Sequence, residues 1–507
     1  RCGNANLLSL AANLKIKKGI DCISDDNLNK ITSVSRLVAE IANMPPPDNI
    51  AYVGSSAFTH KGGLHASAVE KNPSTYEHID PELVGNSRNV IISNQAGKSN
   101  LLNQLKKMSI DINENQIKLI AELLRNSKRP IIISGQGVRI AGAIELLTKL
   151  VKLFKIPVVT PYLGIDTIRH DEKSYIGKVG VKGERAANLA MQNSDLVLSI
   201  GSSLHVSVIG YNYKQFAREA KKIVIDIDEI THKKQTIDID QFVHADAKDF
   251  LNILLKKSTK DGLSNYASWL EKCNEWKNKY PTCLPDYKNT NDQVNSYFLI
   301  DQICKNSKSG DIFVSDAGGT FYAVSQAITL TKPNQRYIPS SAMATMGYSL
   351  PAAIGISVAT GERVIAFTGD GSLQQTIQEF QTLVEYNLPV KLFVLNNDGY
   401  HSIRTSQKNY YDGRYIGESS KSGISFPDTV KIAEAYGIKA FRINQPSEIN
   451  DIVNQVLNYD GPVICDVIVP REQEIIPTVA SRVNDDGSMS SRPLEDMYPF
   501  LDREEYQ

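Results

Sequence analysis

Short apolar runs alternate with longer amphipathic stretches from Pro130 to about residue 257. The pattern predicts strands over 131–134, 156–160, 195–200 and 222–226, and a helix over 138–153. Buried strands separated by helices are typical of βαβ units in a parallel sheet. We therefore expect this part of the chain to form an α/β domain.

The same alternation returns between about residues 295 and 470. Here the pattern predicts strands over 311–315, 336–339, 364–368, 390–395 and 462–469, and helices over 374–386 and 447–458. The expected fold class is therefore α/β, with two doubly wound parallel-sheet domains.

The remaining segments lack this alternation. Residues 1–118 are rich in turns, with helical spacing over 30–43 and again over 114–126. The polar tail is expected to wrap a surface of the protein or of a neighbouring subunit. We expect five parts: a loop- and helix-rich leading segment over 1–118, a central α/β domain over 119–257, a helical linker over 258–292, a second α/β domain over 293–470 and a tail over 471–507.

Composition narrows the class of protein further. The 507 residues are 41% hydrophobic and 22% charged, and the 56 basic residues equal the 56 acidic ones. Zero net charge gives no overall attraction to nucleic acid or to an anionic membrane, and no run of 18 apolar residues is present. The six cysteines lack CxxC spacing, which predicts free thiols in a cytoplasmic protein. Because the chain starts at Arg1, without Met or a signal peptide, we expect it to be processed or incomplete at its amino end.

The most informative stretch is the strand predicted over 364–368 and the Gly369-Asp-Gly-Ser372 that follows it. Glycines at the carboxyl end of a parallel strand allow backbone N–H groups to approach a phosphate. Asp370 would repel a phosphate unless a divalent cation lay between the two groups. Taken alone, Gly-Asp-Gly is equally compatible with an ordinary β-turn.

A second set of oxygen ligands follows the next predicted strand, in Asn396-Asn-Asp-Gly-Tyr400. Asn397 lies 27 positions after Asp370, a spacing of one helix plus one strand, so neighbouring strands can bring the two residues together. The Asn397 amide, the Gly399 carbonyl and the Asp370 carboxylate are suitable ligands for Mg²⁺. The sequence therefore predicts a magnesium and phosphate site at this edge of the sheet.

This order of motifs resembles the signature of thiamine-diphosphate enzymes. The stretch from Met343 to Gly355, MATMGYSLPAAIG, is similar to that of acetolactate synthases, and the resemblance covers about residues 119–507. It implies Mg²⁺ at Asp370, Asn397 and Gly399, and a 2-keto acid substrate, pyruvate, whose two-carbon unit passes to an acceptor carbonyl. It also implies a homodimer or homotetramer. The residues expected to contact thiamine diphosphate are Gly318, Gly319, Met346, Gly369, Gly371 and Ser372.

The central domain leaves FAD open as a second cofactor. Ser134-Gly-Gln-Gly137 is a weak glycine turn after a strand, and Gly183–Asn188 resembles part of the FAD region of acetolactate synthases. The Arg-rich stretch of those enzymes is replaced by Gly201–His205. Beside the predicted metal loop, His401 is a candidate proton shuttle, with a structural role as the alternative.

The leading segment resembles a different family. Arg1–Leu7, Ala57–His65 and Tyr76–Gly85 are similar to citramalate and 2-isopropylmalate synthases, which condense acetyl-CoA with a 2-keto acid in a metal-dependent TIM barrel. Asn4 matches one metal ligand of that barrel, whereas the other ligands have no counterpart.

Three histidines of this segment, His60, His65 and His78, have spacings that match no common metal site. We therefore expect them to be structural, in a remnant of the synthase that follows its barrel.

Together the two resemblances predict an incomplete active site. In thiamine-diphosphate enzymes a preceding pyrimidine-binding domain supplies the Glu that activates the cofactor, and here the synthase-like segment stands in its place. We therefore expect full activity only if this Glu comes from elsewhere. Two alternatives stay open: a fragment of a citramalate or 2-isopropylmalate synthase that condenses acyl-CoA, and an inactive chimera.

Overall fold

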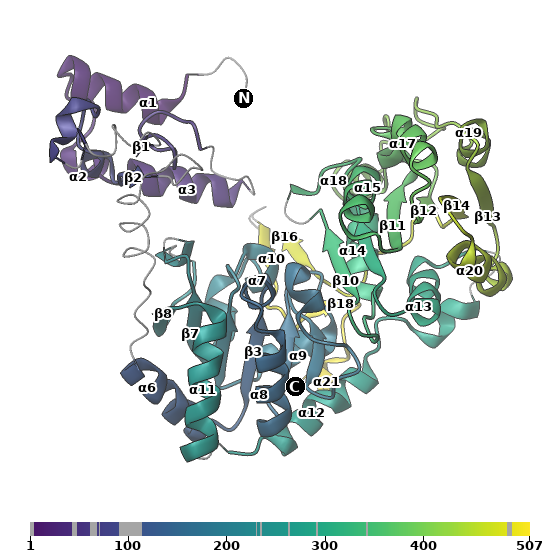
Figure 1. Ribbon diagram of the computed structural model, residues 1–507, viewed down its shortest axis with the longest axis horizontal. Helices are drawn as coiled ribbons and strands as arrows, with labels where there is room; N and C mark the ends of the chain where they lie inside the picture. Colours follow the sequence, from purple (N-terminus) through teal and green to yellow (C-terminus); the bar gives the residue numbers. More distant parts are fainter. Residues whose placement is uncertain are drawn as a thin grey trace. The chain divides into compact units, whose positions relative to one another are not determined.

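The computed structural model describes residues 5–42, 48–60, 68–69, 71–90, 114–229, 231–233, 236–261, 264–289, 293–340, 343–483 and 489–506. The chain divides into two compact units, Arg1–Asp111 and Ile112–Gln507, whose elements are labelled in Figure 1. Among the helices of these residues, none is both long enough and apolar enough to cross a membrane.

The first unit consists of short helices and a two-stranded parallel sheet. Its helices are α1 (Leu7–Ala12), α2 (Asp25–Leu28) and α3 (Ile31–Ile41), and its strands are β1 (Thr59–His60) and β2 (Asn89–Val90). Helix α3 confirms the helix predicted over 30–43. The core of the unit contains Ala12, Leu28, Ile31, Tyr52, Val53, Phe58, Ile79 and Val84.

The second unit begins with a six-stranded parallel sheet in the order β5-β4-β3-β6-β7-β8. Numbered along the chain this order is 3-2-1-4-5-6, that of doubly wound dinucleotide-binding folds. Successive strands are added on one side of β3 up to β5 and on its other side from β6 onward, so the order switches between β3 and β6. The strands are β3 (Pro130–Ser134), β4 (Val158–Thr160), β5 (Tyr175–Lys178), β6 (Leu196–Ile200), β7 (Lys221–Asp226) and β8 (Gln241–His244).

Helices cover both faces of this central sheet. Apolar side chains of α6, α8 and α11 pack on one face, and those of α9 and α12 pack on the other. The helix predicted over 138–153 is wrong as a single element, because Gly142 adopts a φ of +65° and separates α7 from α8. The helices are α6 (Glu114–Asn126), α7 (Gln136–Ile140), α8 (Ile144–Phe154), α9 (Arg185–Gln192), α10 (Val206–Ile209), α11 (Ala247–Asp261) and α12 (Ala267–Lys279).

A second six-stranded parallel sheet follows, in the order β10-β9-β11-β12-β14-β13. Its connections change direction between β9 and β11, so the carboxyl ends of these strands are the expected place for a ligand. The strands are β9 (Ile312–Ser315), β10 (Arg336–Pro339), β11 (Val364–Gly369), β12 (Val390–Asn396), β13 (Lys439–Ile443) and β14 (Val463–Ile468).

This C-terminal domain also has a core on each side of its sheet. Helices α13, α14 and α20 pack on one side, and α15, α17 and α19 pack on the other. The helix predicted over 374–386 begins only at Phe380, because the backbone of Thr376 (φ −143°) leaves the helical region. The helices are α13 (Ser296–Asn306), α14 (Gly318–Ala327), α15 (Ser349–Thr360), α16 (Asp370–Leu373), α17 (Phe380–Glu385), α18 (His401–Tyr410), α19 (Thr429–Ala435) and α20 (Ile449–Asn458).

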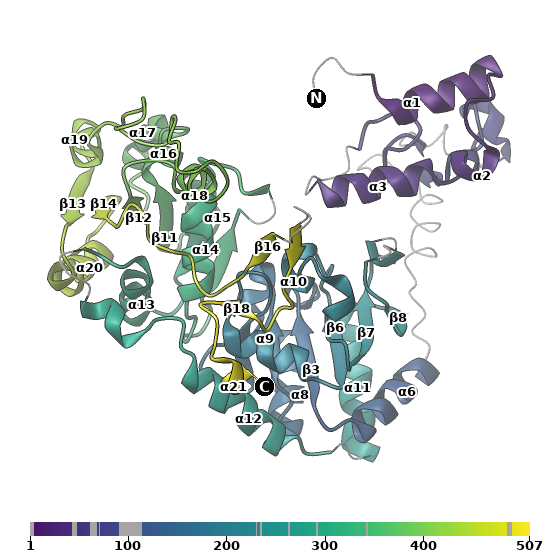
Figure 2. The same cartoon turned by 180° about the vertical axis from the view of Figure 1, so that it is seen from behind.

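The tail returns to the central domain, where Figures 1 and 2 show it beside α9. Leu494 and Met497 are buried in the same core as α9, and Asn188 of α9 donates a hydrogen bond to the Leu494 carbonyl at 3.0 Å. The tail therefore packs on a surface of its own chain. Its elements are β15 (Thr478–Val479), β16 (Ser481–Val483), β17 (Met489–Ser491), β18 (Met497–Tyr498) and α21 (Arg503–Tyr506).

Candidate active site

Three neighbouring strands of the C-terminal sheet end in polar residues. Strand β11 pairs with β9 on one side and with β12 on the other. Because all three are parallel, Asp316, Asp370 and Asn397 follow them at the same edge of the sheet. The sequence motifs are thus brought together by the fold.

The Asp370 side chain is buried, with 3% of the residue exposed. Its carboxylate accepts hydrogen bonds from the backbone N–H groups of Gly371 (3.0 Å) and Gly399 (2.8 Å). Within the described part of the chain, it forms no ion pair with a Lys, Arg or His. Burial raises the pKa of Asp370 to about 7, as expected for a carboxyl group that lacks a positive neighbour.

The Asn397 amide oxygen is also buried, and within the described residues it has no hydrogen-bond partner. A buried polar atom of this kind costs about 1–3 kcal/mol if it stays unsatisfied, so it calls for a ligand. An amide oxygen beside a buried carboxylate is a donor set that suits Mg²⁺. The residues therefore fit a divalent cation.

The diphosphate expected beside this cation would lie among glycines that contact the start of α18. A Cβ on Gly319 would lie 3.0 Å from His401 Nδ1, and one on Gly371 would lie 2.3 Å from Tyr400 Cε1. Gly318 adopts a φ of +58°, which favours glycine. Gly369 is different, because a Cβ there would meet only Thr320 Oγ1 at 3.5 Å.

Asp316 organises the opposite side of this edge. Its carboxylate is fully buried and accepts hydrogen bonds from Thr368 Oγ1, from Ser372 Oγ (2.6 Å) and from the Tyr348 N–H (3.1 Å). The Ser372 hydroxyl also accepts a hydrogen bond from the Gly347 N–H at 2.8 Å. The hydroxyl is thus engaged within the protein, which leaves the Ser372 backbone for a cofactor contact.

Met346 precedes Gly347 in the loop between β10 and α15. Its side chain is 39% exposed, so it is accessible to a ligand beside the Ser372–Gly347 hydrogen bond. The sequence motif named Met346 and Ser372, but it did not reveal the hydrogen bonds that join Ser372 to Asp316 and Gly347.

His401 begins α18 and contacts Gln473. Its Nε2 lies 2.8 Å from the Gln473 carbonyl oxygen, and since a carbonyl can only accept, Nε2 carries the proton. Burial lowers the pKa of His401. The ring is therefore neutral near pH 7, with Nδ1 as an acceptor beside Gly319. Its role as a proton shuttle stays a prediction.

The side chains of the segment predicted to resemble an FAD region are engaged within the protein. Glu184 pairs with Lys178 at 2.9 Å, Arg185 donates to the Pro499 carbonyl at 2.5 Å, and Asn188 donates to Gly180 at 2.9 Å. These contacts explain the residues as structural. They give no support for FAD, which stays an open prediction.

The glycines of the weak turn after β3 pack against the loop after β6. A Cβ on Gly135 would lie 2.1 Å from the Gly201 carbonyl oxygen, and one on Gly137 would lie 2.6 Å from the Gly201 Cα. The close approach of the two loops is therefore enough to require glycine at these positions.

The histidines of the first unit have protein partners where they can be described. His60 Nε2 lies 3.0 Å from Glu77 Oε1, and Arg88 donates to both oxygens of the same carboxylate. The His78 ring contacts the Tyr52 ring edge-on. Asn4 and His65 lie outside the described residues. Within the described residues, no group of three His, Cys, Asp or Glu side chains is suited to hold a metal.

The described cysteines, Cys22, Cys273, Cys283, Cys304 and Cys465, are free thiols. Burial raises the pKa of Cys304 to about 11 and raises those of Cys273 and Cys465 further. Because the thiolate is the nucleophile, these three cysteines are poor candidates for catalysis.

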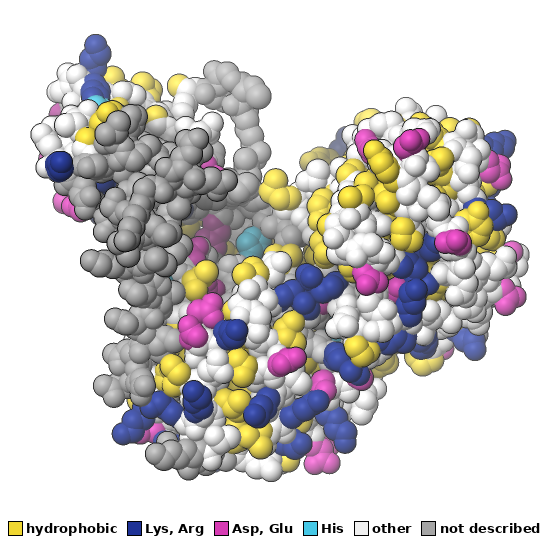
Figure 3. Space-filling view, viewed as in Figure 1, with side chains coloured by type: hydrophobic (Ala, Val, Ile, Leu, Met, Phe, Trp, Pro, Cys, Tyr) yellow, Lys and Arg dark blue, Asp and Glu magenta, His cyan; other side chains and the backbone are white. Residues whose placement is uncertain are grey.

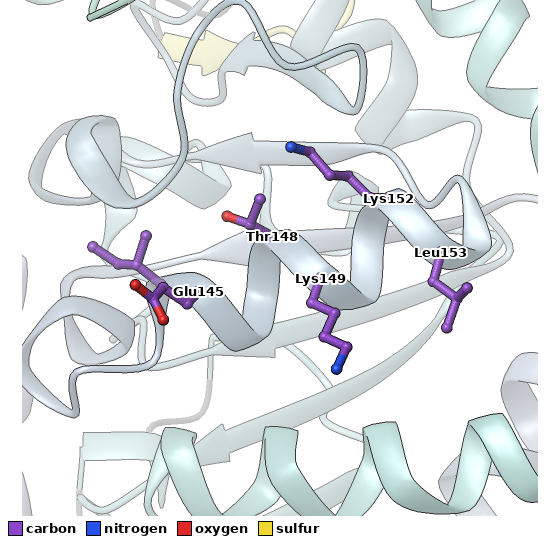
Figure 4. A pocket seen from close by; sticks show the side chains of 6 residues that line it. Glu145, Thr148, Lys149, Lys152 and Leu153 are labelled. Carbon is purple, nitrogen blue, oxygen red and sulfur yellow. The ribbon is translucent and has the colours of Figure 1, made fainter. Parts of the chain in front are cut away.

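A groove of about 610 Å³ lies along α8 of the central domain. Figure 4 shows its side chains, which all come from this one helix. They do not converge on a point as the groups of a ligand site do, and the groove is not at the strand ends that carry Asp370. It is lined by Ile144, Glu145, Thr148, Lys149, Lys152 and Leu153.

Family comparisons agree with these two sheets. Residues 316–467 match the thiamine pyrophosphate enzyme C-terminal TPP binding domain, and residues 117–254 match the central domain of the same enzymes. Residues 52–129 match the homocitrate synthase post-HMGL domain-like family. The predicted resemblance of the leading segment to a condensing synthase is thus confirmed, with homocitrate synthase as the matching name.

Curated relatives of the chain are acetolactate synthase large subunits. That of Porphyra purpurea is 31% identical over 373 residues, which cover 73% of this chain and 62% of the relative. The probable large subunit of Methanococcus aeolicus is 32% identical over 402 residues, covering 76% and 66%. That of Methanocaldococcus jannaschii is 33% identical over 377 residues, covering 72% and 61%. The chain therefore spans about three fifths of the length of these relatives.

Two of the three matched segments thus have the same origin. The chain contains the central and C-terminal domains of the thiamine pyrophosphate enzymes, and the curated relatives that share this region are acetolactate synthase large subunits.

Proposed function

We propose that the chain binds thiamine diphosphate through Mg²⁺ and acts as an acetolactate synthase-like transferase. Its substrate would be a 2-keto acid, pyruvate, which loses carbon dioxide and gives its two-carbon unit to an acceptor carbonyl. The observation that carries this proposal is the buried Asp370 carboxylate, which accepts a hydrogen bond from the Gly399 N–H, together with the buried Asn397 amide oxygen of the same loop. Within the described residues, the carboxylate has no basic partner and the amide oxygen has no hydrogen-bond partner.

Each residue of the site has a distinct role in this proposal. Asp370, the Asn397 amide and the Gly399 carbonyl hold Mg²⁺, which neutralises the diphosphate. Backbone N–H groups of Gly318, Gly319 and Ser372 would bind the diphosphate, whereas that of Gly371 donates to Asp370, and Met346 would contact the rings. When bound, the cofactor supplies an electron sink for the carbanion that decarboxylation leaves. His401 Nδ1 could accept a proton at the edge of the site.

We also propose that the carboxylate which activates the cofactor comes from a second polypeptide or from residues outside these 507. The matched domains are the central and C-terminal ones, and the relatives are longer than the region they share with this chain. A positioned acid or base contributes roughly 10²–10⁴-fold in rate. The chain alone is therefore expected to bind cofactor well but to turn over slowly.

A homodimer or homotetramer is part of the same proposal. Helix α15 (SLPAAIGISVAT) contains no charged residue, although Pro351, Gly355 and Val358 are exposed on it. Figure 3 shows hydrophobic side chains gathered on the face of the C-terminal domain where α15 and α18 lie. An uncharged helix is usually buried on all sides. Light scattering of the full chain would measure the oligomeric state, and a monomer would contradict this part.

Calorimetric titration of thiamine diphosphate in the presence of Mg²⁺ tests the cofactor proposal. The change Asp370→Asn keeps the shape of the side chain but removes the charge that holds the cation. We expect the affinity for thiamine diphosphate to fall by more than the roughly 10- to 100-fold that is typical when a residue hydrogen-bonded to a metal ligand is replaced. Asp311→Asn is the matched control, because Asp311 is equally buried but precedes β9 at the opposite edge of the sheet.

Two results would contradict the proposal in different ways. A wild-type chain that does not bind thiamine diphosphate would overturn the cofactor assignment. Equal binding by the wild type and Asp370→Asn would keep the cofactor but overturn the metal site.

A further inference from the structure

The loop at 397–399 carries two of the proposed cation ligands, but it also contains oxygen atoms that are not proposed as ligands. Asn397, Asp398 and Gly399 each have a backbone carbonyl, and Asn397 has its amide oxygen as well. Two of the carbonyls, those of Asn397 and Asp398, accept hydrogen bonds from Arg404 at 3.3 and 3.0 Å. Among the described residues, the Gly399 carbonyl and the Asn397 amide oxygen have no such partner.

Arg404 is held in a fully enclosed position one turn into α18. Its side chain is 3% exposed, and its Nε donates to Glu418 Oε2 at 2.5 Å. Its Nη1 also donates to the Arg471 carbonyl at 2.5 Å. The guanidinium thus joins the loop at 397–398 to Glu418 and Arg471, which lie 14 and 67 residues after Arg404.

Glu418 fixes the position of this guanidinium from the other side. Its side chain is 2% exposed and also contacts Arg471 Nη2 at 3.3 Å. Burial alone would raise the pKa of Glu418, but hydrogen bonds from Ser419 and Arg404 hold it below its ordinary value. The carboxylate is therefore charged near pH 7, as the pairing requires.

The backbone of Glu418 contacts the same loop directly. Its carbonyl accepts a hydrogen bond from the Tyr400 N–H at 2.8 Å. A Cβ on Gly399, whose φ is +139°, would lie 1.8 Å from this oxygen. Gly399 is therefore pressed between the Glu418 backbone and Asp370, to which its N–H donates at 2.8 Å.

We propose that Arg404, fixed by Glu418, is a positioning residue that reserves the Asn397 amide and the Gly399 carbonyl for the cation by engaging the backbone carbonyls of Asn397 and Asp398. The inference rests on the proposed binding of Mg²⁺ and thiamine diphosphate. It assigns a role to two residues that need touch neither the metal nor the cofactor.

The change Arg404→Lys tests the inference because lysine keeps the charge but has a single nitrogen. One ammonium cannot reach Glu418, both loop carbonyls and Arg471 in the fixed geometry of a guanidinium. At saturating thiamine diphosphate, we expect the Mg²⁺ concentration for half-saturation to rise about 10- to 100-fold, as for other residues behind metal ligands.

A second measurement needs no cofactor. Hydrogen exchange of the apo protein over residues 396–400 is expected to accelerate in Arg404→Lys, because Arg404 no longer holds the carbonyls of Asn397 and Asp398 and the loop opens more often. Glu418→Gln retains an acceptor for Arg404 but removes the charge, so we expect a smaller change in the same direction.

Arg363→Lys is the matched control. Arg363 is a partly buried arginine, with 10% of its side chain exposed, and it pairs with Asp311 in the same domain, but it precedes β11 at the opposite edge of the sheet. Its replacement is expected to lower stability without changing Mg²⁺ half-saturation or exchange over 396–400.

The outcomes separate the inference from the proposed function. If the wild type binds Mg²⁺ and thiamine diphosphate but Arg404→Lys and Glu418→Gln bind them equally well, the positioning role is refuted. If Arg363→Lys weakened Mg²⁺ binding as much as Arg404→Lys, the effect of Arg404 would be one on general stability, and the positioning role would also be refuted. Failure of the wild type to bind the cofactor would overturn the proposed function itself.

Discussion

The Ser372 hydroxyl makes two hydrogen bonds that the sequence did not reveal, and their removal is a sharp test of the site. Its Oγ donates to the buried Asp316 carboxylate at 2.6 Å and accepts from the Gly347 N–H at 2.8 Å. The change Ser372→Ala removes both hydrogen bonds and adds no bulk. It therefore isolates the contribution of one oxygen atom to the edge of the sheet.

The expected magnitude follows from the two partners. A hydrogen bond to a charged group contributes about 1.5–3 kcal/mol, and leaving the Gly347 N–H without an acceptor costs about 1–3 kcal/mol. We therefore expect Ser372→Ala to lower the free energy of unfolding of this domain by between about 2.5 and 6 kcal/mol. This is a large fraction of the stability of an ordinary domain.

Ser357→Ala is the matched control in the same domain. The Ser357 hydroxyl on α15 is also buried, but it has no hydrogen-bond partner among the described residues. Its removal is expected to leave stability unchanged or slightly higher, because alanine also favours the helix.

Hydrogen exchange of the peptide that covers β11 reports the stability of this region for both variants. We expect exchange to be at least about tenfold faster in Ser372→Ala, since a factor of ten corresponds to about 1.4 kcal/mol. Equal exchange rates in the two variants would refute the reasoning, since the bridging hydroxyl would then contribute nothing.

Two further changes test the site and its support. Gly371→Ala is expected to abolish binding of thiamine diphosphate, because the new Cβ would lie 2.3 Å from the Tyr400 ring; Gly355→Ala, which meets nothing within 4 Å, should bind it normally. Burial lowers the pKa of Lys391 to about 8, so the unfolded chain holds one more proton than the native protein between about pH 8 and 10.5. The free energy of unfolding of the wild type, measured by urea denaturation, should therefore increase with pH over this range relative to that of Lys391→Met. Parallel pH profiles of the two proteins would contradict this.

Most strands with buried apolar runs were predictable from sequence, whereas three of the four edge strands, β5, β8 and β13, were not; the edge strand β10 was predicted. β9, β11 and β12 lie within the second sheet, so their runs are largely apolar on both faces, with the buried Lys391 of β12 as an exception. β5 and β13, by contrast, are edge strands with partly polar sequences, YIGK and KAFRI. Each pairs with the strand next to it in the chain, β4 or β14, but a short and partly polar run does not by itself indicate a strand.

The same distinction applies to the candidate site. Asp370 and Asn397 stand out because each follows a predicted strand within a recognisable motif. Ser372 and Arg404 act through partners that are 56 and 67 residues away, respectively. Such contacts are fixed only when the sheet has assembled, so a linear reading finds the ligands but misses the residues that hold them in place.

The docking of the tail on α9 imposes an order on synthesis of the protein. Leu494 and Met497 complete a core that begins as early as Ile131, and the hydrogen bond from Asn188 to Leu494 spans 306 positions. The central domain therefore cannot finish packing on the ribosome until residues 494–497 have emerged. A premature stop near the carboxyl end would leave an early domain, rather than a late one, with an exposed apolar surface.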